Sequence, residues 1–396
     1  MLEKGSLEGV RILDFTWVVA GPLAAAILAD QGAEVIRIQN PLAPIIPLGD
    51  ERWGFDASLN RNKCSITVNM ADPRGLDIAK RLIQVSDIVM ENFSSRVMGH
   101  WGLDYEGQKK LNPGIIYMSM GGLGHSGRLK DWVTYGPTLQ GMCGLNYLTG
   151  FPDGDPAGCG YSYPDVAGGY TAALALTMAL WHRQRTGEGQ YIDLAQLESA
   201  CSLMGTALLE CTANNGSPKR RGNRSPDLPA APHAAYRCKG DDRWCVIAVF
   251  GGPDWKAFCN VIGNPPWTKE ERFATLLDRV KNSEELDRLV EAWTQEHEAE
   301  EVMKRMVEAG IAAGVVQHGD DIIDRDPQLA FRYWEYLESP EGVRGRYPGI
   351  PPKLSDTPGG LRLCGPKLGE HNDYVFGKVL GMPAEEIEQY KKDRVI

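Results

Sequence analysis

The stretch "VRILDFTWVVAGPLAAAILADQGAEVIRIQ" (residues 10–39) decides the fold of this chain. Short apolar runs at 10–15 and 34–39 enclose a segment at 21–32 whose apolar residues have the spacing of a helix. The order strand, helix, strand predicts parallel strands joined by crossover helices, which cover both faces of the sheet.

The same order continues further along the chain. The pattern predicts a helix at 74–86 and strands at 87–93 and 114–120. In open parallel sheets, ligands bind beyond the carboxyl ends of the strands, so the loops that follow the strands should converge on one crevice. These loops are Phe15–Val18, Asn92-Phe93 and Gly121-Gly122.

Composition along the chain predicts two domains. Residues 1–215 end in a strand and an apolar helix, and residues 216–232 are rich in Pro, Ser, Arg and Asn and predict a linker. Residues 233–325 predict a small α+β domain, and 326–396 return to the large, Rossmann-like α/β domain. The small domain has two apolar runs that predict strands, at 243–250 and 311–317.

Composition also restricts the cellular setting and the partners. The net charge of −10 argues against a nucleic-acid partner, because such proteins present broad basic surfaces. No signal peptide and no run of about 18 apolar residues is apparent, so we expect neither secretion nor membrane association. The 9 cysteines form no CxxC pair, and the histidines lack metal-ligand spacing, which predicts a cytoplasmic protein without a metal.

Several common catalytic motifs are missing. The sequence has no HExxH, no nucleophile elbow and no Walker loop, and "FTWVVAGP" stands where a dinucleotide-binding GxGxxG would follow the first strand. The glycine-rich segment "GGLGHSG" (121–127) matches no phosphate-binding loop, and it is open whether it is a plain loop or a lid over a site.

One acidic residue stands out. Asp165 comes directly before a long apolar helical pattern in "GYSYPDVAGGYTAALALTMALWHRQRTG" (160–187). An aspartate there is explained by capping of the helix N-terminus. The small residues after it also let a ligand approach closely, and a carboxylate is a competent nucleophile toward an activated acyl group. The pattern alone leaves both interpretations open.

Taken as a whole, the sequence resembles the class III CoA-transferases, a family that includes formyl-CoA transferase, carnitine CoA-transferases and benzylsuccinate CoA-transferases. The resemblance covers nearly the whole chain. It rests on several blocks in the same order, among them "LEGVRILDFTWVVAGPLAAAILADQGAEVIRIQNP", "LNRNKCSITVNMADPRG", "VMENFSSRVMGHWGLDY", "HRQRTGEGQYIDLAQLES", "APHAAYRCKGDDRWCVIAV" and the terminal "PKLGEH".

The resemblance implies that Asp165 is the nucleophile that carries CoA as an aspartyl-CoA thioester. It implies coenzyme A, in the form of an acyl-CoA, and a carboxylic acid as substrates. The segment "APHAAYRCKGDDRWCVIAV" resembles the succinyl-CoA-dependent members of the family, which implies succinyl-CoA as donor and an aromatic or dicarboxylic acid as acceptor. The apolar Trp17 and Val19 add a branched acid as a candidate. It also implies an interlocked homodimer, with a heteromer of two homologous chains as the alternative.

The resemblance further assigns site residues. Those implied to line the active site are Trp17, Val19, Tyr135, Gln140, Gly121 and Gly122. Those implied to contact CoA are Val18, Ala20, Arg37, Met70, Arg74, Asn92, Phe93 and Arg96. The chain departs from formyl-CoA transferase at Asn40 and His100, where a basic residue is expected, and at Val19, where a glutamine is expected. Formate and oxalate are therefore poor candidate substrates.

The α-methylacyl-CoA racemases share this fold and are the alternative within enzymes. They use a histidine and an aspartate to move a proton, and this chain has Tyr135 near the position of that histidine. A neutral phenol with a pKa of about 10 is a poor base near neutral pH. Tyr135 therefore favours a transferase over a racemase or isomerase. The remaining alternative is a non-catalytic partner subunit of a heteromeric transferase.

Overall fold

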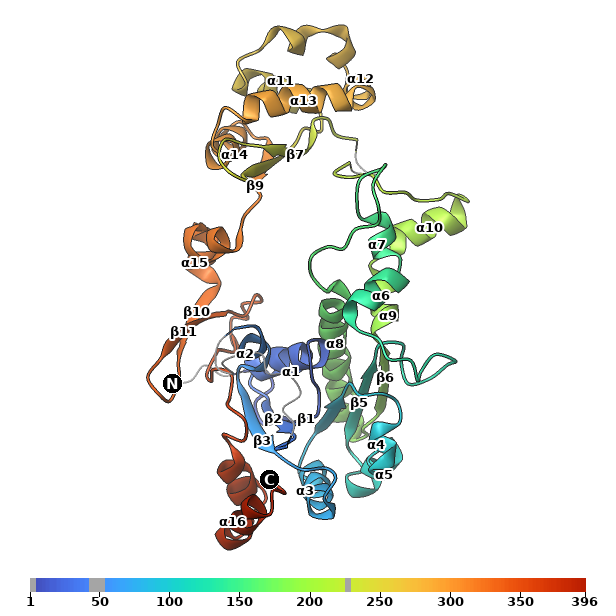
Figure 1. Ribbon diagram of the computed structural model, residues 1–396, viewed down its shortest axis with the longest axis vertical. Coiled ribbons are helices and arrows are strands. Elements are labelled where there is room, and N and C mark those ends of the chain that lie inside the picture. The colour runs from blue at the N-terminus through green and yellow to red at the C-terminus, as the bar shows by residue number, and fades with distance from the viewer. Residues whose placement is uncertain (1–4, 43–53, 225–228) are drawn as a thin grey trace. The chain divides into compact units, whose positions relative to one another are not determined.

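The structure, a computed structural model, describes residues 5–42, 54–224 and 229–396 (Figure 1). The chain forms two compact units. The larger one consists of Met1–Asn146, Gly158–Gly216 and Phe331–Ile396, and the smaller one of Tyr147–Ala157 and Ser217–Ala330. The linker expected at 216–232 falls partly on 225–228, which lies outside the described residues.

The larger unit is built on a sheet of six parallel strands in the order β3-β2-β1-β4-β5-β6. This is the strand order of the Rossmann fold, so the α/β prediction is confirmed. The strands are β1 (Arg11–Asp14), β2 (Glu34–Gln39), β3 (Lys63–Thr67), β4 (Ile88–Glu91), β5 (Ile116–Gly121) and β6 (Tyr191–Ala195).

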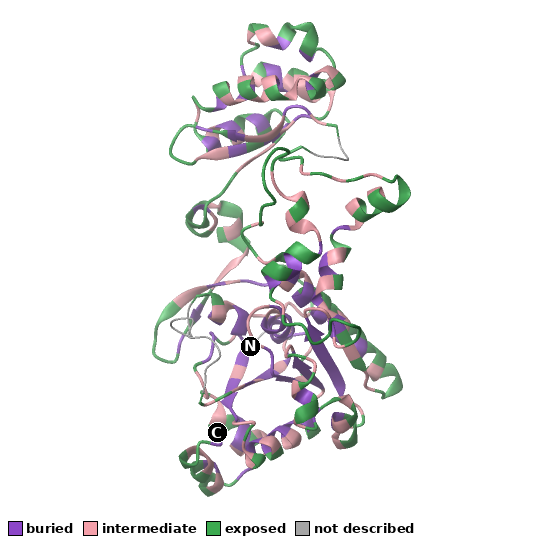
Figure 2. Ribbon diagram, turned by 45° about the vertical axis from the view of Figure 1, so that its right-hand side comes forward, coloured by how far each residue is buried: buried purple, intermediate pink, exposed green. Residues whose placement is uncertain are grey.

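Successive residues of each strand face opposite sides of the sheet, which divides the core into two layers. In β1, Leu13 packs in one layer with α3 (Pro73–Gln84), while Ile12 packs in the other with α1 (Ala20–Asp30) and α8 (Tyr163–Thr186). Buried residues follow the strands along their length (Figure 2). This explains the near-continuous apolar runs from which the strands were predicted.

Helices α1 and α8 pack against each other through small residues. A Cβ on Gly169 would lie 2.9 Å from Leu23 Cδ2 and 3.0 Å from the Ala20 carbonyl oxygen, so only glycine permits this approach. The second turn of α8 is thereby held against the first turn of α1, which directly follows the loop after β1. The small residues after Asp165 thus serve helix packing.

Further helices complete the larger unit. They are α2 (Phe55–Asn60), α4 (Val97–His100), α5 (Tyr105–Leu111), α6 (Gly136–Met142), α9 (Gln196–Ser202), α10 (Gly205–Ala213) and α16 (Ala384–Lys392), with a π-helix, η4, at Asp373–Val379; α7 (Leu145–Leu148) lies at the boundary of the two units. One continuous apolar helix was expected after β6, but α9 ends at Ser202 and α10 begins at Gly205.

The last part of the chain contains a hairpin that the sequence analysis did not predict. Strands β10 (Trp334–Glu338) and β11 (Arg344–Pro348) pair antiparallel. In the same region, Val375, Phe376 and Ile387 join the core layer that α3 covers. The C-terminal segment therefore returns to the large unit.

The smaller unit has an antiparallel sheet in the order β7-β8-β9. Its strands are β7 (His233–Arg237), β8 (Trp244–Ala248) and β9 (Ala312–Val315), and its main helices are α11 (Gly252–Val261), α12 (Leu276–Lys281), α13 (Ser283–Thr294) and α14 (Ala299–Glu308). The shorter helical segments are η1 (Pro266–Lys269), η2 (Glu271–Phe273), η3 (Asp321–Arg325) and α15 (Pro327–Arg332), the last of which ends across the unit boundary.

A large charged side chain lies buried in the smaller unit. Arg279 is buried, and its guanidinium donates to the carbonyl oxygens of Ala231 and Phe273 at 3.0 and 3.1 Å while it stacks on Trp255. Among the described residues of the whole chain, no helix combines the length and the apolar character that crossing a membrane requires.

Candidate active site

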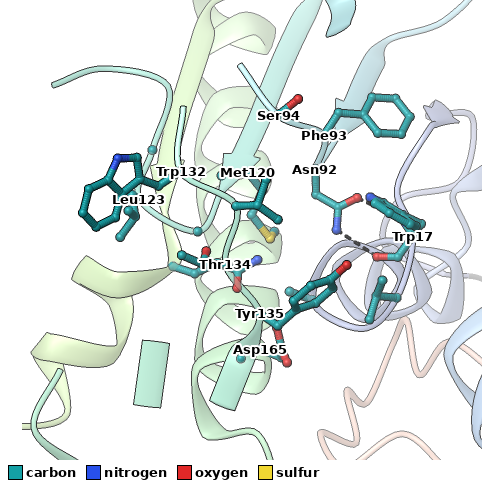
Figure 3. A pocket seen from close by; sticks show the side chains of 18 of the residues that line it. Trp17, Asn92, Phe93, Ser94, Met120, Leu123, Trp132, Thr134, Tyr135 and Asp165 are labelled. Carbon is teal, nitrogen blue, oxygen red and sulfur yellow. Dashed lines mark hydrogen bonds between the residues drawn. The ribbon is translucent and has the colours of Figure 1, made fainter. Parts of the chain in front are cut away.

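A cavity of about 520 Å³ opens at the carboxyl edge of the large sheet (Figure 3). The loops that follow β1, β4 and β5 all line it, as expected from the strand order. Strands β1 and β4 are neighbours, and the chain builds the sheet outward from them in opposite directions. The cavity therefore lies at the topological switch point, where open α/β sheets bind ligands.

Most of the site residues predicted from the sequence meet here. The cavity is lined by Trp17, Val18, Val19, Ala20, Asn92, Phe93, Gly121, Gly122, Tyr135 and Asp165. Sequence reasoning missed other residues that line it, among them His125, Lys130, Trp132, Thr134, Gly136 and Gln196.

The loop after β1 is held in an unusual conformation. Val18 has a φ of 67°, in the left-handed region that β-branched residues rarely adopt. On one side, the backbone N–H of Trp17 donates to Asn92 Oδ1 at 2.9 Å, and Asn92 Nδ2 donates to the Trp17 carbonyl oxygen at 2.8 Å (Figure 3). These two bonds tie the β1 loop to the β4 loop. Strain of this kind persists where the surroundings determine it and is common at functional sites.

A buried ion pair at the end of β1 supports the same loop. Lys63 Nζ lies 2.9 Å from Asp14 Oδ2, and both side chains are fully buried. Asp14 Oδ1 accepts from the backbone N–H and the hydroxyl of Thr16 at 2.8 and 2.5 Å. Lys63 also donates to the Pro22 carbonyl oxygen and to Asn60. Burial lowers the pKa of Lys63 to about 8, although Asp14 opposes this shift.

The loops after β4 and β5 meet at a second buried acid. Glu91 is fully buried and accepts from the backbone N–H of Phe93 at 2.7 Å and from the Tyr117 hydroxyl at 3.1 Å. His125 Nδ1 lies 3.8 Å from Glu91, and its Nε2 lies 3.3 Å from the Phe93 carbonyl oxygen. Burial raises the pKa of Glu91, and His125 opposes this rise. His125 is therefore a fixed part of the cavity wall.

Asp165 is not the N-cap of its helix. Ser162 occupies the N-cap position of α8, and Asp165 is the third residue of the first turn. The capping interpretation of Asp165 is therefore wrong. The carboxylate is half-buried, and this burial raises the pKa of Asp165 while the Ser162 hydroxyl opposes the rise. The positive end of the α8 dipole favours its charged form.

Gly136, at the start of α6, makes room for this carboxylate. A Cβ on Gly136 would overlap both Asp165 Oδ2 and Ser162 Oγ. The backbone of Gly136 therefore lies directly beside the carboxylate. Any residue other than glycine at this position would displace the Asp165 side chain.

The segment between β5 and α6 contributes apolar side chains to the cavity that Asp165 also lines. Trp132, Val133 and Tyr135 line the cavity and are 63%, 76% and 56% exposed. Apolar groups that face open space in a cavity with a few polar groups are typical of an organic ligand site. Asp131, in the same segment, accepts from the Ser95 hydroxyl at 2.7 Å and pairs with Arg96 at 2.8 Å.

The remaining predicted site residues do not line this cavity. Gln140 is buried in α6, where its amide is placed to donate to the Tyr161 carbonyl oxygen at 3.0 Å. Met70 packs against the core layer that α3 covers. Their roles in substrate or CoA contact stay predictions.

The arginines predicted to contact CoA are paired with acids. Arg37 lies 3.6 Å from Asp56, and Arg74 pairs with Asp72 and Asp393 at 2.9 and 2.5 Å, as Arg96 does with Asp131. The permanent cation that lines the cavity, among the described residues, is instead Lys130.

One group in the smaller unit has the composition of a cation site. Ligand atoms of His318, Asp320 and Asp321 lie within 4.8 Å of one another. Arg243 already pairs with Asp321 at 2.5 Å, and Arg325 pairs with the same carboxylate at 3.1 Å. Most of the negative charge of Asp321 is thereby neutralised. The expectation of a protein without a metal stays a prediction.

Comparison with known proteins gives a consistent result. A family profile described as CoA-transferase family III matches residues 7–372. The chain is 33% identical to succinyl-CoA–D-citramalate CoA-transferase of Chloroflexus aurantiacus, over 98% of each chain. It is 29% identical to the beta subunit of succinyl-CoA–L-malate CoA-transferase of the same organism, also over 98% of each chain. A CAIB/BAIF family protein from Brucella suis has a similar structure, with a TM-score of 0.87, 30% identity and coverage of 95% of this chain and 100% of that one.

Proposed function

We propose, from the premise that this chain belongs to CoA-transferase family III, that it moves CoA from succinyl-CoA to a dicarboxylic acid through a thioester on Asp165. As a class III CoA-transferase, it takes CoA as part of its acyl-CoA substrate. The observation that carries the proposal is the half-buried Asp165 carboxylate, held in the first turn of α8 and facing the cavity at the switch point of the sheet.

In the first step, one carboxylate oxygen of Asp165 attacks the carbonyl carbon of the donor thioester. A carbon–oxygen bond forms, the carbon–sulfur bond breaks, and the CoA thiolate leaves with the electron pair. The product is a mixed anhydride between Asp165 and the donor acid. Because the attacking group is a carboxylate, the step needs no proton transfer.

The thiolate then attacks Cγ of Asp165. A carbon–sulfur bond forms, the bond from Cγ to the bridging oxygen breaks, and the donor acid leaves as a carboxylate. The acceptor carboxylate reverses this sequence: it attacks Cγ of the aspartyl thioester and releases the thiolate, which then attacks the acceptor carbonyl carbon. The thioester is conserved throughout, so the transfer consumes no nucleotide.

The cavity supports the choice of a large acyl group with a second negative charge. Trp17, Trp132 and Tyr135 offer apolar surface to the chain of the acid, and Lys130 is the cation that lines the cavity among the described residues. Lys130 is exposed, so it offers a carboxylate at the far end of a substrate a charge-assisted contact at the solvent-facing part of the cavity. The names of the two relatives refer to citramalate and malate, which are both dicarboxylic acids.

We also propose that the active form is an interlocked homodimer. One face of α8 supports an assembly, because Tyr170, Leu174, Met178 and Trp181 follow one another at helical spacing and are 53%, 57%, 56% and 63% exposed. A continuous apolar stripe of this length is typical of a surface that another chain covers. A heteromer is the alternative, since one relative is named as a subunit of a transferase.

The substrate proposal is tested by steady-state transfer from succinyl-CoA to a panel of acids, with separation of the CoA esters. The panel pairs each dicarboxylic acid with the monocarboxylic acid of equal length, and includes aromatic and branched acids. We expect the dicarboxylic member of each pair to be preferred, and Lys130→Met to raise its KM while leaving that of the monocarboxylic member unchanged. Equal use of both members, or no effect of Lys130→Met, would refute the role of the second carboxylate.

A further inference from the structure

We propose that Ser162 is a second catalytic residue: its hydroxyl donates a hydrogen bond to the oxygen of Asp165 that becomes negatively charged each time Cγ of Asp165 is attacked. This inference rests on the proposed function, because it concerns the steps in which Asp165 itself is the electrophile.

The position of Ser162 in its helix does not explain its side chain. Serine at an N-cap usually accepts a hydrogen bond from a backbone N–H in the first turn. Ser162 occupies that position in α8, but its side chain makes no capping bond. Helix capping therefore does not explain the Ser162 hydroxyl.

The Ser162 hydroxyl is also buried. In the resting protein, Ser162 Oγ makes no hydrogen bond of normal geometry to any described residue, although the Asp165 carboxylate lies close enough for the hydroxyl to oppose the rise of its pKa. Leaving a buried hydroxyl without a partner costs about 1–3 kcal/mol, so such a group needs an explanation. A donor that forms its best bond only during the reaction provides one.

Gly136 shows that the two oxygens face the same small space. A Cβ on Gly136 would overlap both Ser162 Oγ and Asp165 Oδ2, so both oxygens border the position that this Cβ would occupy. Because Gly136 has no side chain, nothing from α6 separates them. This geometry assigns Oδ2 as the oxygen that stays a carbonyl oxygen and leaves Oδ1 as the attacking atom.

The chemistry places negative charge on that oxygen twice in each turnover. When the thiolate attacks Cγ of the anhydride, an electron pair moves from the carbon–oxygen double bond onto Oδ2, and it returns as the bond to the donor acid breaks. The acceptor carboxylate produces the corresponding intermediate when it attacks the thioester, with the acceptor acid in place of the donor acid and the charge again on Oδ2; the electron pair returns as the carbon–sulfur bond breaks. Ser162 keeps its proton throughout and donates a hydrogen bond that strengthens as the charge develops.

The first step of the reaction differs. When Asp165 attacks the donor, the charge develops on the carbonyl oxygen of the substrate and not on Oδ2. Ser162 is therefore expected to act on formation and discharge of the thioester, and not on binding of the acyl-CoA.

The experiment compares the wild type with Ser162→Ala by rapid quenching and intact-mass measurement, at saturating succinyl-CoA. We expect the rate at which the CoA adduct forms, and the rate at which an acceptor acid discharges it, to fall by roughly 10²-fold, the usual effect of removing one oxyanion donor. The Kd for a non-reactive thioether analogue of the acyl-CoA should stay unchanged.

Ser86→Ala is the matched control. Ser86 is also buried in the larger unit, but its hydroxyl donates to the Leu82 carbonyl oxygen at 2.7 Å and lies before β4, at the amino edge of the sheet. This variant should form and discharge the adduct at the wild-type rates.

Three results would overturn the role of Ser162: wild-type adduct rates in Ser162→Ala, a loss that lies entirely in the Kd for the analogue, or an equal loss in Ser86→Ala. Failure of the proposed function looks different, because the wild type itself would then form no adduct.

Discussion

The proposed role of Asp165 as nucleophile and the folding of the chain make opposite demands on this carboxyl. A nucleophile has to be ionised, but burial raises the pKa of this carboxyl above its ordinary value of 3.8 and so makes the charged form costly. The folded chain binds this proton more tightly than the unfolded chain does. The contribution of Asp165 to stability is therefore fully present below the ordinary pKa and is lost as the pH rises through the raised pKa of the folded chain.

This linkage predicts that Asp165→Asn stabilises the protein at neutral pH. The amide is uncharged, so the variant avoids the cost of burying a carboxylate. We expect a higher Tm than that of the wild type near neutral pH, and a gap that closes as the pH falls and the wild-type carboxyl takes up its proton. Calorimetric Tm values over a pH series test this. A gap that widens in acid would contradict the assigned direction of the pKa shift.

Gly136→Ala should inactivate the enzyme without unfolding it. The added methyl group overlaps Asp165 Oδ2 and Ser162 Oγ, and displacing a nucleophile by about 1 Å costs on the order of 10²-fold in rate. Gly141→Ala on the same helix is the control, because its Cβ would meet nothing within 4 Å. Turnover and Tm are measured for both variants. Normal turnover in Gly136→Ala would show that the carboxylate is not held where the structure places it.

The residues of the site were predictable to different degrees. Asp165 and the three loops could be located, because position after a strand or before a helix is visible in the sequence. Gly136 and Ser162 could not, since their importance depends on which side chains they meet in space. The basic residues were the hardest, because Arg37, Arg74 and Arg96 pair with Asp56, Asp393 and Asp131, acids whose proximity no spacing reveals.

At the scale of elements, the loop after β1 depends on the buried ion pair between Lys63 and Asp14. Lys63 begins β3, Asp14 ends β1, and Pro22 lies in the first turn of α1, so the Lys63 ammonium group joins three elements. A buried pair of this kind is costly to break, because removing one partner leaves the other charge uncompensated.

Lys63→Met should therefore destabilise the protein by about 3–5 kcal/mol, the range for breaking a buried pair. Adding Asp14→Asn removes the isolated charge, and we expect the double variant to recover most of the lost stability. Urea unfolding of the wild type, Lys63→Met and the double variant measures this. A double variant less stable than Lys63→Met would show that the two charges do not act as a pair.

The elements that sequence reasoning missed share a cause. In β3, the side chains of Lys63 and Ser65 are buried, so a strand inside the sheet carries polar residues and has no long apolar run. Strand β7 contains little beyond His233, two alanines and Tyr236, and the β10–β11 hairpin is largely polar. Such strands are defined by their partners in the sheet, and a pattern within one segment cannot show them.

At the scale of the whole molecule, the exposed stripe of α8 is the feature that a single chain does not explain. Trp181→Glu, which introduces a charge into this stripe, should convert the assembled protein to monomers and reduce its activity. Val85→Glu is the control, because Val85 is 41% exposed at the end of α3, a helix that packs in the other core layer from α8. Sedimentation of both variants and of the wild type measures the change.

Assembly through α8 would be contradicted by a wild type that is monomeric and active. It would equally be contradicted by an unchanged oligomeric state in Trp181→Glu. Dissociation caused by Val85→Glu as well would show that the effect of a new charge is not specific to the stripe.

The central claim is that Asp165 carries CoA during transfer. The most direct test is the intact mass of the purified protein after incubation with succinyl-CoA, with Asp165→Ala as the control variant. The wild type should gain one CoA in thioester linkage, hydroxylamine should remove it, and Asp165→Ala should gain nothing. A wild type that binds CoA but forms no adduct, or an adduct that persists in Asp165→Ala, would contradict the account.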